Sequence, residues 1–308
     1  MNCEVSNHYL LKKYKDFDGL RKEIFISLQV EKRMDRFKEI KVRVFDAFID
    51  KFAERYVQQR SFVDEEAIRK AAEMDCGLDI SCLMDVIRRN SCFVDPEREA
   101  GKQSKSIMND VYRSDLGELL TTYYFEEKLP EGERYTIPLK NISSRELYNM
   151  PGRGLDAIGF RKEADGSYTL LLSEAKVSNE KRNPPRVVHY NDDSIYKTHK
   201  EHHDNLPMVL QRLTDYLRKL PSGEGFMAIA CIVIMLEKGD LDKLKITYGC
   251  GLVRDMSCVD VSRDFGKMQT NLEEFRPGEV DFAIFTFTEK NIDEAVDLFY
   301  HKVIEITR

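Results

Sequence analysis

Two acidic residues and a lysine in the middle of the chain have types and a spacing that suit metal-dependent hydrolysis. Asp156 begins one apolar segment, and Glu174 and Lys176 end a second one that contains Leu170–Leu172. Residues two apart on a strand point to the same side, so Glu174 and Lys176 emerge together. Converging carboxylates supply the hard oxygen ligands that Mg²⁺ prefers, and a neighbouring lysine can orient an attacking water. The pattern therefore predicts hydrolysis of a phosphodiester.

The turn between these two segments decides whether the three side chains meet. The dipeptide Asp165-Gly166 is a strong short-range signal for a β-hairpin. A three-residue loop that ends with this glycine in the left-handed conformation sets Asp156 directly opposite Glu174. A two-residue loop instead sets Asp156 opposite Ala175, facing away, unless a bulge compensates.

A third carboxylate, Glu118, stands upstream in a helical segment and could add to the site. The Glu-x-Lys pattern carries little weight by itself, because Glu39–Lys41 and Glu126–Lys128 repeat it in helical surroundings. Glu174 and Lys176 differ because they end a buried strand, where two charges need a functional or a paired role. A purely structural ion pair is the alternative.

The order of these elements resembles that of the PD-(D/E)xK nuclease superfamily, whose restriction-endonuclease-like core is a mixed sheet flanked by helices. Leu155 stands where the name of the superfamily has a proline. More narrowly, three segments are similar to the nuclease subunit (HamA-like) of Hachiman antiphage defence systems. They are Asp115-Leu-Gly-Glu118-Leu-Leu, Gly152-Arg-Gly-Leu-Asp156-Ala-Ile-Gly159 and Glu174-Ala-Lys176-Val, and the resemblance spans roughly residues 110–180.

This resemblance implies an effector nuclease that cuts DNA in the bacterial cytoplasm beside a helicase subunit. Asp156 and Glu174 would bind Mg²⁺, with Mn²⁺ as a substitute, Lys176 would assist the attacking water, and Glu118 would support the site. An independent observation agrees with a partner. The sequence contains no GxxxxGK(S/T) phosphate-binding loop, so ATP-driven unwinding would need another subunit. A nuclease that acts alone, and a nuclease-fold subunit for assembly or DNA docking without turnover, are the alternatives.

Basic side chains near these segments could contact DNA phosphates, which position a nucleic acid without reading its sequence. The candidates are Arg153, Lys181, Arg182, Arg186, Lys197 and Lys200. Asp192 and Asp193 dilute this charge, and a solvated surface is the alternative. The net charge of −6 and the pI of about 5.7 restrict any nucleic-acid contact to a local surface or one shared with a partner.

Other features favour a globular protein without a second catalytic motif. His199 and His203 lie one helical turn apart and could bind a metal, but the HExxH spacing is absent and a solvated helix start is the alternative. The seven cysteines form no CxxC pair, which is typical of reduced thiols. No apolar signal-peptide core occurs from Met1 to Lys15, and Phe226–Leu236 is too short to cross a bilayer, so we expect a soluble protein.

The first hundred residues predict helices, with apolar residues at helical spacing from Tyr9 to Arg60 and again from Asp64 to Asn90. A polar connector at 101–106 indicates a boundary near residue 105. The predicted organisation is a helical N-terminal region, 1–105, followed by a PD-(D/E)xK-like nuclease domain, 106–308. The N-terminal helices are candidates for a partner interface, and a bundle that packs only on its own nuclease domain is the alternative.

The second region predicts an α/β layered domain, because helical and strand patterns alternate along it. The expected elements are a helix from Ser114 to about Lys128, strands over Asp156–Phe160 and Tyr168–Val177, helices over Ile195–Leu220 with a break near Pro207, a buried strand over Phe226–Leu236, strands over Lys245–Tyr248 and Asp281–Phe287, and a helix over Ile292–Ile306.

Overall fold

The structure is a computed structural model that describes residues 25–32, 35–44, 46–63, 65–74, 79–95, 106–145, 154–218 and 223–308. Within these residues seven strands form one mixed sheet in the order β1-β2-β7-β6-β5-β4-β3. The strands are β1 (Phe25–Lys32), β2 (Asp35–Val42), β3 (Thr136–Lys140), β4 (Ala157–Lys162), β5 (Tyr168–Ser178), β6 (Leu244–Arg254) and β7 (Glu279–Phe287). β2, β7, β6 and β5 are parallel, whereas β1–β2 and β5–β4–β3 pair antiparallel.

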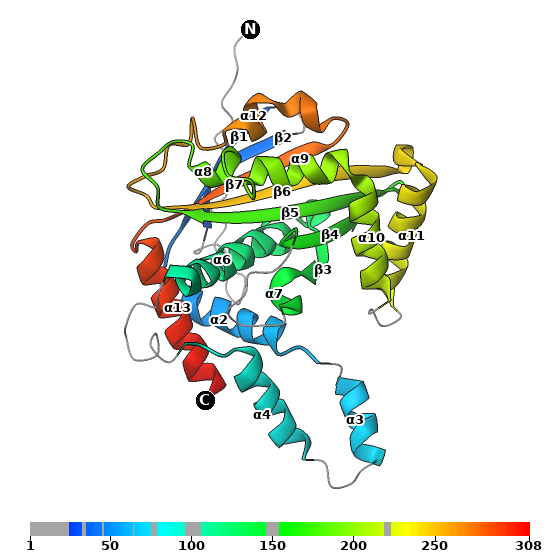
Figure 1. Cartoon of the computed structure of the whole chain (residues 1–308), viewed down its shortest axis with the longest axis vertical. Helices are drawn as coiled ribbons and strands as arrows, with labels where there is room; N and C mark the ends of the chain where they lie inside the picture. Colours follow the sequence, from blue (N-terminus) through cyan, green and yellow to red (C-terminus); the bar gives the residue numbers. More distant parts are fainter. Residues whose placement is uncertain are drawn as a thin grey trace.

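Helices cover both faces of the sheet (Figure 1). One face carries α2 (Asp46–Arg60), α6 (Ser106–Tyr123) and α13 (Ile292–Thr307), whose buried residues share one apolar cluster. The second cluster contains residues of α8 (Arg186–His189), α9 (Ile195–Asp204), α10 (Leu206–Leu217), α11 (Glu224–Lys238) and α12 (Lys267–Thr270). Helices α3 (Glu65–Met74) and α4 (Ile80–Ser91) project away from the sheet, and α7 (Asn141–Ser144) follows β3.

The short helical turns complete the list of elements. They are η1 (Tyr124–Lys128), η2 (Glu131–Glu133), η3 (Leu241–Lys243) and η4 (Leu272–Phe275).

Strand β5 shows why the parallel strands of this sheet have continuous apolar sequences. Leu171 belongs to the cluster under α6, whereas Leu170 and Leu172 belong to the opposite cluster. Because helices bury both faces, residues of both parities are apolar, as is typical of parallel strands inside an α/β protein. By the same alternation Glu174 lies on the face of Leu172, and Asp156 on the face of Ile158.

Helix α6 lies unusually close to the sheet because glycines stand at the contact. A Cβ built on Gly251 of β6 would lie 1.9 Å from Thr121 Oγ1, and one built on Gly117 of α6 would lie 2.7 Å from Val177 Cγ2. Thr121 Oγ1 itself donates to the Gly117 carbonyl at 2.8 Å. This close approach holds Glu118, the next residue of α6, near enough to Asp156 and Glu174 for their charges to raise its pKa.

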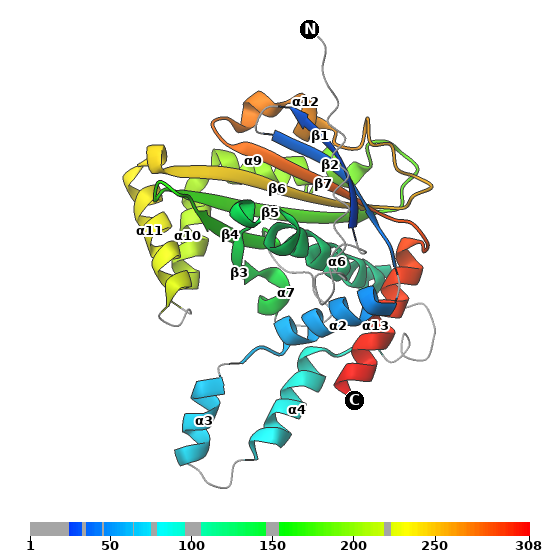
Figure 2. The same ribbon diagram turned by 180° about the vertical axis from the view of Figure 1, so that it is seen from behind.

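The helical prediction for the N-terminal part is wrong for Phe25–Lys32 and Asp35–Val42. Instead of helix, β1 and β2 form an antiparallel pair, and β2 pairs in parallel with β7 near the other end of the chain (Figure 2). The charged residues of β2 are stabilised by distant partners, as when Asp35 Oδ1 accepts from the Val280 amide at 2.9 Å and pairs with Arg276. Local periodicity cannot reveal such pairing. The helical prediction agrees with α2, and the residues before Phe25 lie outside the described part of the chain.

Phe226–Leu236, expected as a buried strand, is instead part of helix α11. Ala228, Ile229 and Ile232 are buried at helical spacing, whereas Met227 and Ile234 are 61% and 52% exposed. An apolar run of this length fits either structure, and periodicity alone does not separate them. As a helix, this segment buries only the apolar side chains of one face. The position beside β5 in the sheet is taken by β6, so no place for a strand is left there.

The other expected elements of the second region largely agree with the structure. Ile195–Leu220 forms α9 and α10, with Pro207 in the first turn of α10, and the last expected helix corresponds to α13. The two later strand predictions fall inside β6 and β7. The helix expected from Ser114 begins earlier, at Ser106, so Ser114 lies inside α6 and is not its cap.

The predicted boundary near residue 105 falls in 96–105, outside the described residues. Residues on both sides of it, such as Phe52 of α2 and Phe299 of α13, belong to one apolar cluster. None of the described helices is long and apolar enough to cross a membrane.

The close contact of α6 with β6 predicts that Gly251→Ala destabilises the fold. The added methyl would overlap the Thr121 side chain, and overpacking of this kind costs about 1–3 kcal/mol in the free energy of unfolding. Urea denaturation measures this loss, and a second change, Thr121→Ala, should recover part of it. Gly132→Ala is the control, because a Cβ there meets nothing within 4 Å. Equal midpoints for the Gly251 and Gly132 variants would contradict the prediction.

Candidate active site

The register of the β4–β5 hairpin sets Asp156 opposite Glu174. Ala157 pairs with Ser173, so the next pair outward in an antiparallel ladder is Asp156 with Glu174. The Glu163 amide donates to the Ser167 carbonyl at 2.9 Å, which leaves a three-residue loop between them. Gly166 ends this loop with a φ of 84°. This is the loop length on which the sequence prediction depends.

Asp156 is held in place by backbone contacts on both sides. The Ala175 amide donates to its Oδ2 at 2.6 Å, and the Asn141 amide donates to its main-chain carbonyl at 2.7 Å. Burial raises the pKa of Asp156 to about 6, although Lys176, the Ala175 amide and Asn141 all lower it. The carboxylate is therefore fixed in direction, and it is protonated at a higher pH than an ordinary aspartate.

Glu174 and Lys176 form an ion pair at the end of β5. Lys176 Nζ lies 3.0 Å from Glu174 Oε1 and 3.3 Å from Asp193 Oδ2. Burial and the negative charge of Asp156 raise the pKa of Glu174 to about 8, and Lys176 opposes this. Burial lowers the pKa of Lys176, but the three acids around it raise it above its ordinary value. Lys176 is therefore a protonated donor and not a general base.

Glu118 reaches the same cluster from helix α6. Ser114 Oγ donates to Glu118 Oε1 at 3.2 Å, and Arg145 Nη2 lies 3.6 Å from the same oxygen. Arg145 also pairs with Asp115. Burial and the charge of Asp156 raise the pKa of Glu118 well above its ordinary value, while Arg145 lowers it. The structure thus brings Glu118 into electrostatic contact with the hairpin residues.

The donor set fits a divalent cation. Glu118 Oε2 and Glu174 Oε2 are buried without a hydrogen-bond partner among the described residues. Buried carboxylate oxygens that repel one another are stabilised by a proton or by a metal ion. Over the described ranges no group of three or more His, Cys, Asp or Glu side chains is placed so that it could hold a metal ion, so Glu118 does not complete a three-carboxylate site with the hairpin. Asp156 and Glu174 are therefore the two oxygen donors that the hairpin itself offers.

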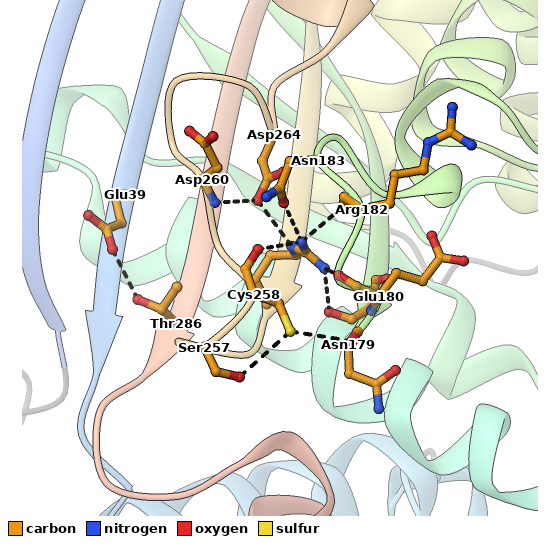
Figure 3. Close-up of polar contacts among 12 residues, drawn as sticks. Glu39, Asn179, Glu180, Arg182, Asn183, Ser257, Cys258, Asp260, Asp264 and Thr286 are labelled. Atoms are coloured by element: carbon orange, nitrogen blue, oxygen red, sulfur yellow. Dashed lines mark hydrogen bonds and ion pairs between the residues drawn. The ribbon is translucent and has the colours of Figure 1, made fainter.

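A buried arginine joins the two loops that follow β5 and β6. Arg254 is fully buried at the end of β6, opposite Ser178 in the register. It donates to the carbonyl oxygens of Ser178, Glu180, Arg182 and Cys258 and to Asn183 Oδ1, and its Nε lies 3.0 Å from Asp264 Oδ2. Figure 3 shows residues of both loops converging here. The loop that leaves the Lys176 strand is therefore fixed in its backbone course.

The basic residues proposed to contact DNA are partly neutralised by neighbouring acids. Arg186, Lys197 and Lys200 form ion pairs with Glu180, Asp192 and Asp204, respectively. The Arg182 guanidinium lies 3.8 Å from the centre of the Tyr190 ring, and Lys181 is exposed. Arg153 lies outside the described residues. A role of these residues in DNA binding stays a prediction.

The histidines of α9 make packing contacts with β6. His199 is buried, its Nε2 lies 3.2 Å from the Gly249 carbonyl, and burial lowers its pKa to about 3. His203 Nδ1 lies 2.6 Å from the Tyr248 hydroxyl. These contacts explain the histidines as neutral residues that dock α9 on the sheet, and not as the solvated helix start that the sequence also allowed.

Sequence analysis missed two residues that position the carboxylates, Asn141 and Arg145. Both come from the segment after β3, and their contacts with Asp156 and Glu118 join parts of the chain that no motif connects. A basic residue between two predicted elements carries no local signal, so only the folded arrangement identifies Arg145.

Comparison with known proteins assigns the chain to a family. A family model described as HamA matches residues 22–303. The chain belongs to the HamA family. The protein is thus a component of Hachiman antiphage defence, a multi-component system. No curated protein matches the chain at a significant level.

The raised pKa of Glu174 predicts that Glu174→Gln stabilises the metal-free protein at alkaline pH. A folded-state pKa above the unfolded value means that the folded protein loses stability as the pH rises from about 4.5 to about 8. Glutamine mimics the protonated acid and removes this loss. Thermal melting in EDTA should show a melting temperature higher by roughly 3 °C at pH 8, with a smaller difference at pH 5.

Glu201→Gln is the control for this measurement, because Glu201 is exposed on α9. Its melting temperature should follow that of the unmodified chain at both pH values. A Glu174 variant that melts at or below the unmodified chain at pH 8 would show that the buried carboxylate is not strained.

Proposed function

We propose that this protein is a metal-dependent DNA nuclease of the PD-(D/E)xK type, the effector subunit of a Hachiman defence complex. The observation that carries the proposal is the facing pair Asp156 and Glu174, with Lys176 Nζ 3.0 Å from Glu174. A carboxylate pair beside a protonated amine suits a phosphodiester, because the substrate and its transition state are anionic.

Each residue has a distinct role in the proposed hydrolysis. Asp156 and Glu174 hold Mg²⁺, for which Mn²⁺ substitutes, and Glu118 supports the site from α6. The chemistry that an ion held by these residues would supply is polarisation of the phosphoryl oxygen and a lower pKa for a water molecule. Lys176 orients the attacking water and donates to the charge that develops on the phosphate. Burial raises the pKa of Asp156 and Glu174, and the charge of Asp156 adds to the shift of Glu174; a bound cation would offset this cost, in competition with protons.

The proposal includes a helicase partner in the bacterial cytoplasm. The family assignment to a multi-component defence system supports a partner, and the absence of an ATP-binding phosphate loop from the sequence leaves unwinding to another subunit. The projecting helices α3 and α4 offer a surface for such a subunit, since α4 has no buried residue.

The test is cleavage of linear and supercoiled DNA by the purified chain in Mg²⁺ or Mn²⁺, alone and together with the proteins that co-purify with it from its native host. Lys176→Ala should lower the cleavage rate by about 10²-fold or more, because the variant loses the charge that faces the phosphate. Asp156→Asn should do the same through loss of a metal ligand. Lys162→Ala is the matched control, since Lys162 is exposed at the far end of β4.

Two outcomes would contradict the nuclease proposal. Cleavage that survives Lys176→Ala would assign the activity to another site or to a contaminant. DNA binding without cleavage under every condition would favour the subunit that only docks on DNA or assembles the complex.

A further inference from the structure

A fourth charged side chain lies beside Asp156, on the helix layer opposite α6. It is Arg212 of α10, whose guanidinium packs on the backbone of Gly154, two residues before Asp156. A Cβ built on Gly154 would lie 1.4 Å from Arg212 Nη2 and 2.0 Å from its Cζ. Gly154 also has a φ of 80°, which disfavours any other residue. Gly154, which precedes Asp156 and β4, thus leaves the space that the Arg212 guanidinium occupies.

Packing fixes the position of this guanidinium. Val209 and Leu213 on α10 are fully buried in the cluster that covers this face of the sheet. The hydroxyl of Tyr216, one turn after Arg212, donates a hydrogen bond to the Pro138 carbonyl of β3. Residues four apart lie on the same helix face, so Tyr216 holds the Arg212 side of α10 against the strands of the site. Arg212 is half-buried, and the packing of α10 holds its guanidinium against Gly154.

The charges around Arg212 are those of the proposed active site. Burial lowers its pKa, whereas Glu174 and Asp156 raise it. An arginine keeps its charge despite a modest lowering. Asp156 and Glu174 point to the sheet face that α10 covers, so Arg212 meets them from that layer, while Glu118 comes from the other layer.

We propose that Arg212 is a phosphate-binding residue of this site, which donates to the non-bridging oxygens of the substrate phosphodiester beside the Asp156–Glu174 pair. The inference rests on the proposed function. It names Arg212 as the positively charged side chain that binds the substrate. A guanidinium presents a planar pair of donors that matches a phosphate, and a lysine does not reproduce this geometry. A residue that only offset the charge of the two acids would tolerate lysine.

The test is the affinity of the full chain for a short DNA duplex in Mg²⁺, measured by fluorescence anisotropy over a range of salt. All variants carry Lys176→Ala, so that the DNA stays intact. Arg212→Ala should weaken binding about tenfold and reduce the slope of log affinity against log salt by about 0.9, the value for one phosphate contact. Arg212→Lys should restore the slope but only part of the affinity.

Two glycine variants separate this role from a general loss of stability. Gly154→Ala introduces a methyl where the guanidinium lies, so it should reproduce the binding defect of Arg212→Ala. Gly239→Ala imposes a similar backbone strain at the end of α11, at a φ of 66°, but a Cβ there meets nothing within 4 Å. It should bind DNA like the parent. Thermal melts identify any variant that is unfolded, and the remaining variants still decide the question.

Cleavage by the chain with Lys176 intact distinguishes this inference from the proposed function. An unchanged salt slope for Arg212→Ala overturns the inference, and so does a chain that binds no DNA. If the chain cleaves DNA and Arg212→Ala binds and cleaves equally well, the nuclease proposal stands and Arg212 is only a counterion. If the slope depends on Arg212 but nothing is cleaved, Arg212 binds phosphate and the nuclease proposal fails.

Discussion

Two carboxylates that face each other inside a buried hairpin set the conditions for the rest of this structure. Burial raises the pKa of both Asp156 and Glu174, and their proximity adds repulsion, so the folded protein must supply compensating groups. It does so with the Ala175 amide and with the ion pair between Glu174 and Lys176. Burying two acidic side chains side by side lowers the stability of the folded protein. Natural proteins retain such destabilising groups where activity needs them, which agrees with a functional role for Asp156 and Glu174.

The scaffold converges on this hairpin from several parts of the chain. Glycines at the α6 contact let this helix pack closely, so that Glu118 feels the charges of Asp156 and Glu174. Arg254 fixes the loop that follows the Lys176 strand. The helix layer on the other face carries Arg212 against Gly154. A site whose members come from both layers and from one hairpin depends on the complete sheet, because no single element holds more than two of them.

Membership of the HamA family and the geometry of the hairpin support the same proposal by separate routes. The family gives the biological setting, antiphage defence, and the side chains suit the proposed chemistry, hydrolysis at an anionic centre. The cations of the site, Lys176 and Arg212, stand on the sheet face of the carboxylates, so an approaching phosphate would meet positive charge there. The overall acidity of the chain then restricts nucleic-acid contact to this local surface or to one shared with a partner.

The sequence alone determined the hairpin and the common direction of Glu174 and Lys176, because strand alternation and turn chemistry act over a few residues. It left a two-residue and a three-residue loop open, and only the structure decided for the three-residue loop that sets Asp156 opposite Glu174. The sequence also predicted the last helix and the break between α9 and α10. Only the tertiary structure decided that Phe25–Lys32 and Asp35–Val42 are strands and that Phe226–Leu236 is helical, since pairing with β7 and packing beside the sheet override the local pattern. Arg145 and Arg212 likewise meet the carboxylates only in the folded chain, because their contacts join elements far apart in sequence.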